Sequence, residues 1–236
     1  MKGQNRYRLA VVTLGFLPVQ VTRMNVQFTR REFVYGGASL VLATCVGVSA
    51  ACAEVVDVAE LMQPSTLGDI AIGSETAPVT IVEYASMTCA HCADFTMKTF
   101  PQLKERYIDT GKVRYILREF PLDPLAAGAF MLARCAGKDK YYSLVETLFE
   151  QTGKWVVPNP LPPLFAIAKQ AGFTQQTFDE CLSNQTLLDG LEEVRKRGSD
   201  KFKVQSTPTF FINGERLVGA QPLSEFEKLI DKYLKT

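Results

Sequence analysis

Apolar and polar positions in the second quarter of the chain follow the periods of a strand, a helix and a second strand. Residues 79–84 are mostly β-branched and almost continuously apolar, which predicts a strand covered on both faces. Apolar residues at helical spacing follow in residues 95–107, where Pro101 should kink or break the helix and Gly111 should close it. Residues 113–117 predict the next strand. Because a helix connects the two strands, they should be parallel.

Residues 123–203 have a different pattern, which predicts several short helices. Residues 126–136 are apolar nearly all round and predict a buried helix. Four prolines in residues 158–163 mark a loop. Helical spacing of apolar residues recurs in three further stretches, at residues 141–148, 178–182 and 187–194.

The end of the chain predicts a hairpin and a final helix. Residues 208–212 and 215–219 have the pattern of two strands, and Asn213-Gly214 between them is typical of a type I′ turn. Ser224-Glu-Phe-Glu227 predicts a capping box that opens the final helix. The order of elements is therefore β–α–β, a helical insertion, and then β–β–α.

The composition is that of an ordinary globular protein, since 47% of the 236 residues are hydrophobic and 22% are charged. A net charge of +1 gives no electrostatic case for a nucleic-acid partner. The single histidine excludes sites that need two imidazoles, such as that of a HExxH metalloprotease. The glycine-rich motifs that bind nucleotide phosphates are absent from the sequence.

Residues 1–53 have the layout of an export signal. Six lysines and arginines and one acid precede an uncharged stretch at residues 33–53. Arg30-Arg31 resembles the twin-arginine export motif, although a general secretory signal has the same layout. The small residues before Glu54 predict cleavage there, which would place the mature protein in the periplasm. Met24 is an alternative initiator, because a signal of normal length begins there.

The same segment has two alternative interpretations. The uncharged stretch is long enough for an uncleaved membrane anchor, but its glycines and serines make it only weakly apolar. A lipidated Cys52 is the other, although the usual leucine three residues earlier is absent.

Removal of the signal leaves four cysteines, and an even number in an exported chain indicates disulfides. Two of them form Cys89-Ala-His-Cys92 at the start of the first predicted helix. Unpaired N–H groups and the helix dipole favour a thiolate at Cys89, whereas Cys92, one turn on, should stay protonated and attack second. An imidazolium at His91 would favour the Cys89 thiolate further. A stabilised thiolate makes the disulfide form a strong oxidant.

Other interpretations of the motif are weaker. A zinc site would need Cys135 and Cys181 to complete it, because the sequence has no second CxxC. A static disulfide across one helical turn constrains almost no chain. A protease dyad is disfavoured because His91 lies only two residues from Cys89. His91 alternatively is a solvated residue of the first turn, without a catalytic role.

A strand that ends near an acid, the C-x-H-C motif, the helical insertion and Ser206-Thr-Pro-Thr-Phe-Phe-Ile-Asn-Gly214 together resemble the DsbA-type periplasmic thiol oxidases of the thioredoxin superfamily. The resemblance covers residues 64–236. It implies an α/β thioredoxin fold, with a central mixed sheet flanked by helices, formed by residues 64–122 and 204–236. Residues 123–203 would be an inserted all-helical domain.

The resemblance also implies roles for three residues outside the motif. The Thr207-Pro208 bond would be cis, with the proline against the active disulfide and both residues lining the substrate groove; an ordinary trans proline at a strand start is the alternative. Glu83 would be a buried acid beneath the cysteines that relays a proton from Cys92. The alternative for Glu83 is a glutamate on an edge strand that faces solvent.

Cys135 and Cys181 lie on apolar faces of the helical insertion. Some DsbA-like proteins have a second, structural disulfide in this domain, so the resemblance implies a bridge between them. Two buried free thiols are the alternative. The bridge would close a loop of about 46 residues and stabilise the fold by about 4 kcal/mol in the chain-entropy model.

The implied function is to donate the Cys89–Cys92 disulfide to reduced or unfolded exported proteins, with no metal and no cofactor. The family is reoxidised by a quinone-linked membrane thiol oxidase of the DsbB kind. Residues 54–66 are too short for a large dimerisation domain, which favours a monomer. Two alternatives stay open: a reductase or isomerase kept reduced by a membrane electron donor, and a non-enzymatic chaperone or binding module.

Overall fold

A computed structural model describes residues 55–235. The predicted export signal at residues 1–53, with Met24 and Cys52, lies outside the described residues. In residues 55–235, no helix has both the length and the apolar character that crossing a membrane requires.

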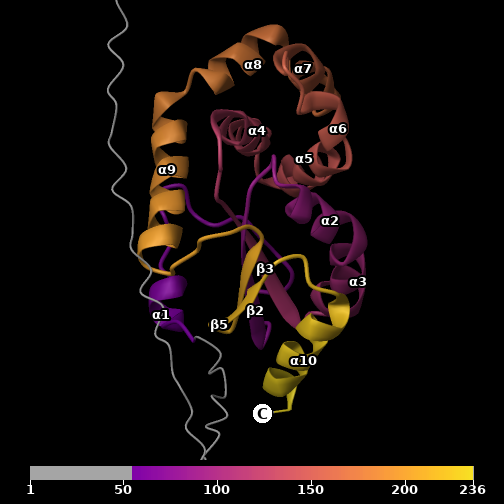
Figure 1. Ribbon diagram of the computed structural model, residues 1–236, viewed down its shortest axis with the longest axis vertical. Coiled ribbons are helices and arrows are strands. Elements are labelled where there is room, and N and C mark those ends of the chain that lie inside the picture. Colours follow the sequence, from indigo (N-terminus) through magenta and orange to yellow (C-terminus); the bar gives the residue numbers. More distant parts are fainter. Residues whose placement is uncertain (1–54, 236) are drawn as a thin grey trace, which may run out of the picture. The chain divides into compact units, whose positions relative to one another are not determined.

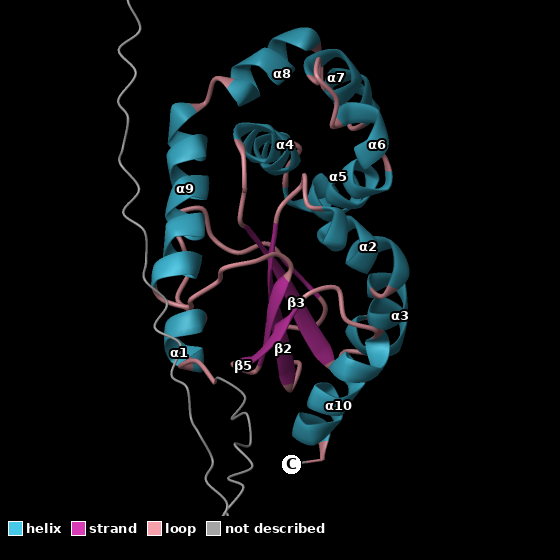
Figure 2. Ribbon diagram, in the orientation of Figure 1, coloured by secondary structure: helices cyan, strands magenta, loops and turns pink. Residues whose placement is uncertain are grey.

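The strands of residues 55–235 form a mixed sheet of five strands in the order β1-β3-β2-β4-β5. Figure 2 shows the strands with helices on both sides. The neighbouring strands β2 and β3 are parallel, and the other neighbouring pairs are antiparallel. This confirms the predicted parallel pair. The strands span Ala71–Ile72 (β1), Val79–Ala85 (β2), Val113–Glu119 (β3), Thr209–Ile212 (β4) and Glu215–Val218 (β5).

The connection from β2 to β3 is helical but interrupted. Helix α2 (Ala90–Lys98) ends at Thr99, α3 (Phe100–Leu103) follows at once, and a π-helical turn, η1 (Lys104–Ile108), completes the connection. Pro101 lies in the first turn of α3, where its missing N–H leaves no helical hydrogen bond unmade. The predicted break at this proline is confirmed.

Both faces of the sheet are covered, which explains why β2 is apolar almost throughout. Alternate side chains of a strand point to opposite faces. Ile81 packs in a core with Phe95 of α2, whereas Tyr84 packs in a second cluster with Phe120 and Phe202. Figure 1 shows α2, α3 and α10 (Leu223–Leu234) on one side of the strands, and α1 (Val58–Leu61) and α9 (Gln185–Asp200) on the other.

The chain between β3 and β4 is helical, as predicted, and α4 lies among the other helices of this segment (Figure 1). Seven residues of α4 are buried, because it is apolar nearly all round. The boundaries 64–122, 123–203 and 204–236 stay a prediction, since one hydrophobic core runs through all three segments. The helices are α4 (Pro124–Cys135), α5 (Lys138–Glu150), α6 (Thr152–Trp155), α7 (Leu161–Gln170), α8 (Gln175–Leu182) and α9 (Gln185–Asp200).

The hairpin of β4 and β5 turns at the predicted dipeptide. Asn213 and Gly214 both have positive φ, 45° and 89°, as a type I′ turn requires. The side chain of Asn213 accepts a hydrogen bond from the N–H of Thr80 at 2.8 Å and donates one to the carbonyl of Pro78 at 3.1 Å. These bonds tie the turn to the start of β2.

The predicted capping box of the last helix is wrong. Helix α10 begins at Leu223, with Pro222 as its N-cap in an extended conformation, and no side chain caps it. Ser224 therefore lies inside the first turn, two residues after the N-cap position. The fixed φ of Pro222 sets the entry of the chain and starts the helix earlier than the serine pattern indicates.

Candidate active site

Cys89 is held at the junction between the end of β2 and the start of α2. It is the N-cap residue of α2, with φ −83° and ψ 117°. Its N–H donates to the carbonyl of Ser86 at 3.1 Å, and the preceding Thr88 hydroxyl donates to the Asp123 carboxylate at 2.5 Å. Asp123 in turn caps α4 by accepting from the N–H of Ala126 at 2.8 Å. The loop before the motif is thus fixed to the helical segment.

The surroundings of Cys89 favour its thiolate. Its pKa falls from an ordinary 9.0 to about 5, chiefly because the Cys92 side chain hydrogen-bonds to it. The Thr207 side chain and the backbone N–H groups of Cys92 and His91 lower the pKa further, and partial burial opposes them. The N–H groups are those left unpaired at a helix start, as predicted from the sequence.

Cys92 has the opposite tendency. Its side chain is fully buried in the first turn of α2, at 0% exposure. Burial raises the pKa of the thiol well above its usual range, and the hydrogen bond to Cys89 and the charge of Glu83 raise it further. Two thiols three residues apart therefore differ in protonation, because Cys89 ionises readily and Cys92 keeps its proton.

His91 lies in the first turn of α2 and contributes to Cys89 through its backbone N–H group. Its side chain is exposed, and the pKa of the exposed Asp94 carboxylate is lowered chiefly by Lys98 and to a smaller extent by His91. The main contribution of His91 to the Cys89 thiolate comes from its N–H group. A catalytic role for the imidazole stays a prediction.

The Thr207–Pro208 peptide bond is cis, the conformation that the resemblance implied. Both residues are buried, and the Cys89 thiol donates to the carbonyl oxygen of Thr207 over 3.3 Å between Sγ and O. The carbonyl of Pro208 accepts from the N–H of Gly219 at 2.8 Å. A loop from the far end of the chain is thereby placed directly against the motif.

Glu83 is buried in the middle of β2 at 1% exposure, so the solvent-facing alternative is wrong. Burial raises the pKa of its carboxyl to about 8; a hydrogen bond from Tyr115 lowers it, and the charge of Cys89 raises it. The Tyr115 hydroxyl donates to Oε2, while Oε1 is buried and has no hydrogen-bond partner in the described part of the chain.

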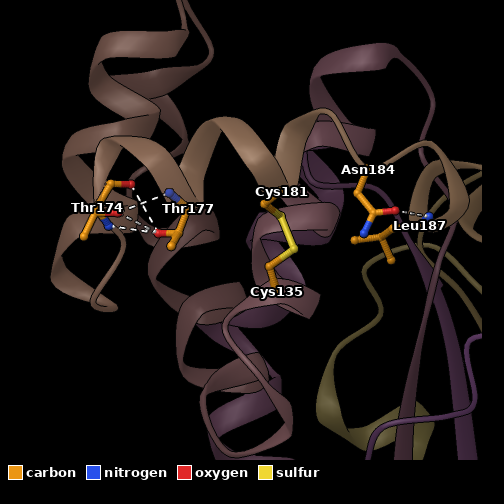
Figure 3. Close-up of a disulfide and its surroundings, with 6 residues drawn as sticks. All are labelled: Cys135, Thr174, Thr177, Cys181, Asn184 and Leu187. Carbon is orange, nitrogen blue, oxygen red and sulfur yellow. Dashed lines mark hydrogen bonds between the residues drawn. A yellow bond between two sulfur atoms is a disulfide. The ribbon is translucent and has the colours of Figure 1, made fainter.

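Cys135 and Cys181 are joined by a disulfide that links the end of α4 to α8 (Figure 3). Among residues 55–235, Cys89 and Cys92 are the free cysteines, so the motif is in its dithiol form. Over the same residues, histidine, cysteine and carboxylate side chains form no group that could hold a metal ion.

Sequence reasoning missed Tyr115 and Asp123. Tyr115 lies opposite Ile81 in the parallel pair of β2 and β3, which puts it on the face of Glu83. The two-residue alternation could have shown this, but only with the register of the strands known. Asp123 precedes Pro124 and is a recognisable helix N-cap, yet its bond to Thr88 depends on the tertiary fold.

Comparison with known proteins gives consistent results. The family model described as Thioredoxin matches residues 65–232. The "Putative protein-disulfide oxidoreductase" of Rickettsia bellii is 34% identical over 148 residues, which cover 62% of this chain and 57% of that protein. The chain thus spans less than two thirds of that relative. Disulfide bond formation protein D of Bacillus subtilis is 28% identical, over 73% of this chain and 80% of that one.

Solved structures agree with the sequence comparison. The crystal structure of Wolbachia pipientis alpha-DsbA1 has a TM-score of 0.70 and 32% identity, covering 76% of this chain and 97% of that one. BdbD from Bacillus subtilis, in its oxidised form, has a TM-score of 0.64 and 25% identity, covering 78% and 100%. With the sheet order, the cysteine motif and the helical insertion, these matches show that the chain belongs to the DsbA-like proteins of the thioredoxin family.

Proposed function

We propose that this protein is a thiol-disulfide oxidoreductase that introduces disulfide bonds into exported proteins by exchange at Cys89 and Cys92. The observation that carries the proposal is the opposite protonation of the two sulfurs. The pKa of Cys89 is lowered to about 5 at a helix start, while that of the buried Cys92 is raised. Structural cysteines do not need this asymmetry, whereas a pair that exchanges disulfides does.

The exchange takes two steps. A client thiolate attacks Sγ of Cys89 in the oxidised protein, the Cys89–Cys92 bond breaks, and Cys92 leaves and takes up a proton. A second client thiolate then attacks the client sulfur of the mixed disulfide, and Cys89 leaves as a thiolate. Two client thiols are oxidised to a disulfide, and the disulfide of the protein is reduced to a dithiol.

The low pKa of Cys89 favours this direction. It makes Cys89 a good leaving group in the second step and stabilises the reduced protein at neutral pH. Thr207 and Pro208 would line the groove that holds the client, because the Thr207 carbonyl lies against Cys89. Glu83 would supply the proton that Cys92 takes up.

The same proposal covers location and partners. The protein acts in the periplasm after cleavage of its signal, and a quinone-linked membrane thiol oxidase of the DsbB kind reoxidises it. Its clients are reduced or unfolded exported proteins, and it works as a monomer. The Cys135–Cys181 disulfide supports an oxidising compartment, and the name of the Bacillus subtilis relative supports the reaction.

Oxidation of a reduced peptide with two cysteines by stoichiometric oxidised protein tests the proposal. Wild-type protein should convert the peptide to its disulfide, and Cys89→Ser should not. A Cys135→Ala/Cys181→Ala variant is the matched control and should keep the activity. The equilibrium with glutathione sets the direction: a potential near that of thioredoxin would indicate a reductase. A Cys89→Ser variant that acts like wild type would show that the reaction is not exchange at this motif.

A further inference from the structure

The carboxyl group of Glu83 has an unequal environment at its two oxygens. The hydroxyl of Tyr115 donates to Oε2. Oε1 is equally buried but has no hydrogen-bond partner within the part of the chain that the structure describes. A buried polar atom without a partner costs free energy, so its presence needs a reason.

Tyr115 is held rigidly enough to fix one oxygen. It is 2% exposed and lies on β3, on the same face of the sheet as Glu83. Its ring centroid is 4.9 Å from that of Phe100 and 6.1 Å from that of Tyr142. Aromatic neighbours on two sides leave the ring little freedom, so the hydroxyl stays at Oε2.

We propose that Tyr115 is a positioning residue for proton transfer: it occupies Oε2 of Glu83, so that Oε1 carries the proton exchanged with Cys92. The inference rests on the proposed function and adds the atom that holds the proton and the residue that selects it. In this role Tyr115 acts through Glu83.

The charged and titratable groups around Glu83 are consistent with this role. Cys89 and Cys92 face it from the start of α2, Tyr115 from β3 and Tyr142 from α5, while its partner on β4 is the apolar Phe210. Burial raises the pKa of Glu83 to about 8, and the bond from Tyr115 limits this rise. Without that bond, the carboxyl would stay protonated near neutral pH and could not accept a proton from Cys92.

During resolution of a mixed disulfide on Cys89, the proton of the Cys92 thiol moves to Oε1 of Glu83. The Cys92 sulfur attacks the Cys89 sulfur, and the bond from Cys89 to the client sulfur breaks. The client leaves as a thiolate. In the reverse direction, which is the first step of client oxidation, neutral Glu83 returns the proton from Oε1 to the departing Cys92.

An aromatic disulfide, 5,5′-dithiobis(2-nitrobenzoate), tests this step in reduced protein with Cys45→Ser and Cys52→Ser, which leaves the motif as its only pair of thiols. Cys89 releases the first nitrothiobenzoate, and attack by Cys92 releases the second in a step independent of reagent concentration. Because nitrothiobenzoate leaves as a thiolate and needs no proton, the pH midpoint of the rate of the second step reflects the titration of groups in the protein.

Tyr115→Phe should move this midpoint upward by about one to two pH units, since a hydrogen bond to a charged group is lost. Tyr84→Phe is the matched control, because Tyr84 is also buried but bonds Arg118 on the opposite face of the sheet. Its midpoint should equal that of the wild type. In a Glu83→Gln background, Tyr115→Phe should cause no further shift, whereas a purely structural effect would persist.

Carbon-13 NMR of the Glu83 carboxyl gives a readout that does not depend on activity. Its titration midpoint should rise in Tyr115→Phe and not in Tyr84→Phe. In the wild type, which needs no variant to fold, the Tyr115 hydroxyl proton should give a slowly exchanging downfield signal that moves as Glu83 titrates. Absence of that signal, or equal midpoints in the two variants, overturns the role of Tyr115. Failure of wild-type protein to oxidise a client, with the NMR shift intact, overturns the proposed function instead.

Discussion

Replacing Cys92 by alanine should raise the pKa of the Cys89 thiol, because it removes the largest single cause of its low value. That pKa falls from an ordinary 9.0 to about 5, and the hydrogen bond from the Cys92 side chain is the first contribution. A hydrogen bond to a charged group contributes about 1.5–3 kcal/mol, equivalent to about one to two pKa units. Screening at the partly exposed Cys89 favours the lower end of this range.

The assay is the ultraviolet absorbance of the thiolate as a function of pH. With Cys45→Ser and Cys52→Ser, and with Cys135 and Cys181 in their disulfide, Cys89 is the remaining thiol of the Cys92→Ala chain. Cys92→Ser is the matched control, since its hydroxyl can still donate to the thiolate. Its midpoint should stay close to that of the wild type.

Equal midpoints for the alanine and serine variants would refute this reasoning. The low pKa would then come from the backbone N–H groups at the start of α2 and from Thr207, without a contribution from Cys92. A midpoint near 9 in the alanine variant would also contradict the expected shift. The backbone N–H groups and Thr207 would then make no contribution to the low pKa of Cys89.

Three further predictions concern stability. In reduced protein, the difference in unfolding free energy between the wild type and Cys89→Ser should fall as the pH drops from 9 to about 5, because the unfolded chain binds a proton that folded Cys89 has released. Urea titrations in which this difference does not change with pH would contradict the low pKa. Cys135→Ala/Cys181→Ala should lower the unfolding free energy measured with urea by about 4 kcal/mol, since the bridge spans 46 residues. An unchanged unfolding transition would show that the disulfide adds no stability. Asp123→Ala should lower the unfolding free energy by about 1–2 kcal/mol, because the N–H of Ala126 loses its capping carboxylate. Asp123→Asn, which keeps a capping oxygen, should lower it less in the same assay.

Much of the fold was predictable because its signals are local. The apolar run of β2, the helical spacing after it and the apolar residues of 113–117 predict a parallel pair without reference to other parts of the chain. The positive φ angles of Asn213 and Gly214 follow from the residue types in the turn. The two-residue strand β1 was missed because two residues give no period.

Local patterns also misled where a neighbour had the stronger effect. Ser224 and Glu227 have the spacing of a capping box, but the fixed backbone of Pro222 starts the helix before them. For His91, whose imidazole is exposed and whose N–H group lowers the pKa of Cys89, a catalytic role of the side chain stays a prediction.

A dithiol at a helix start after a buried strand can be recognised from the residues around the motif, because helix position, N–H groups and residue types are all encoded within a few residues. The distant groups that surround that dithiol are set by the tertiary fold. The Thr207 carbonyl lies against Cys89, and the Tyr115 hydroxyl lies against Glu83. Both contacts depend on strand register and on the docking of separate elements. These are set by packing of the whole core and are therefore not encoded in any short stretch of sequence.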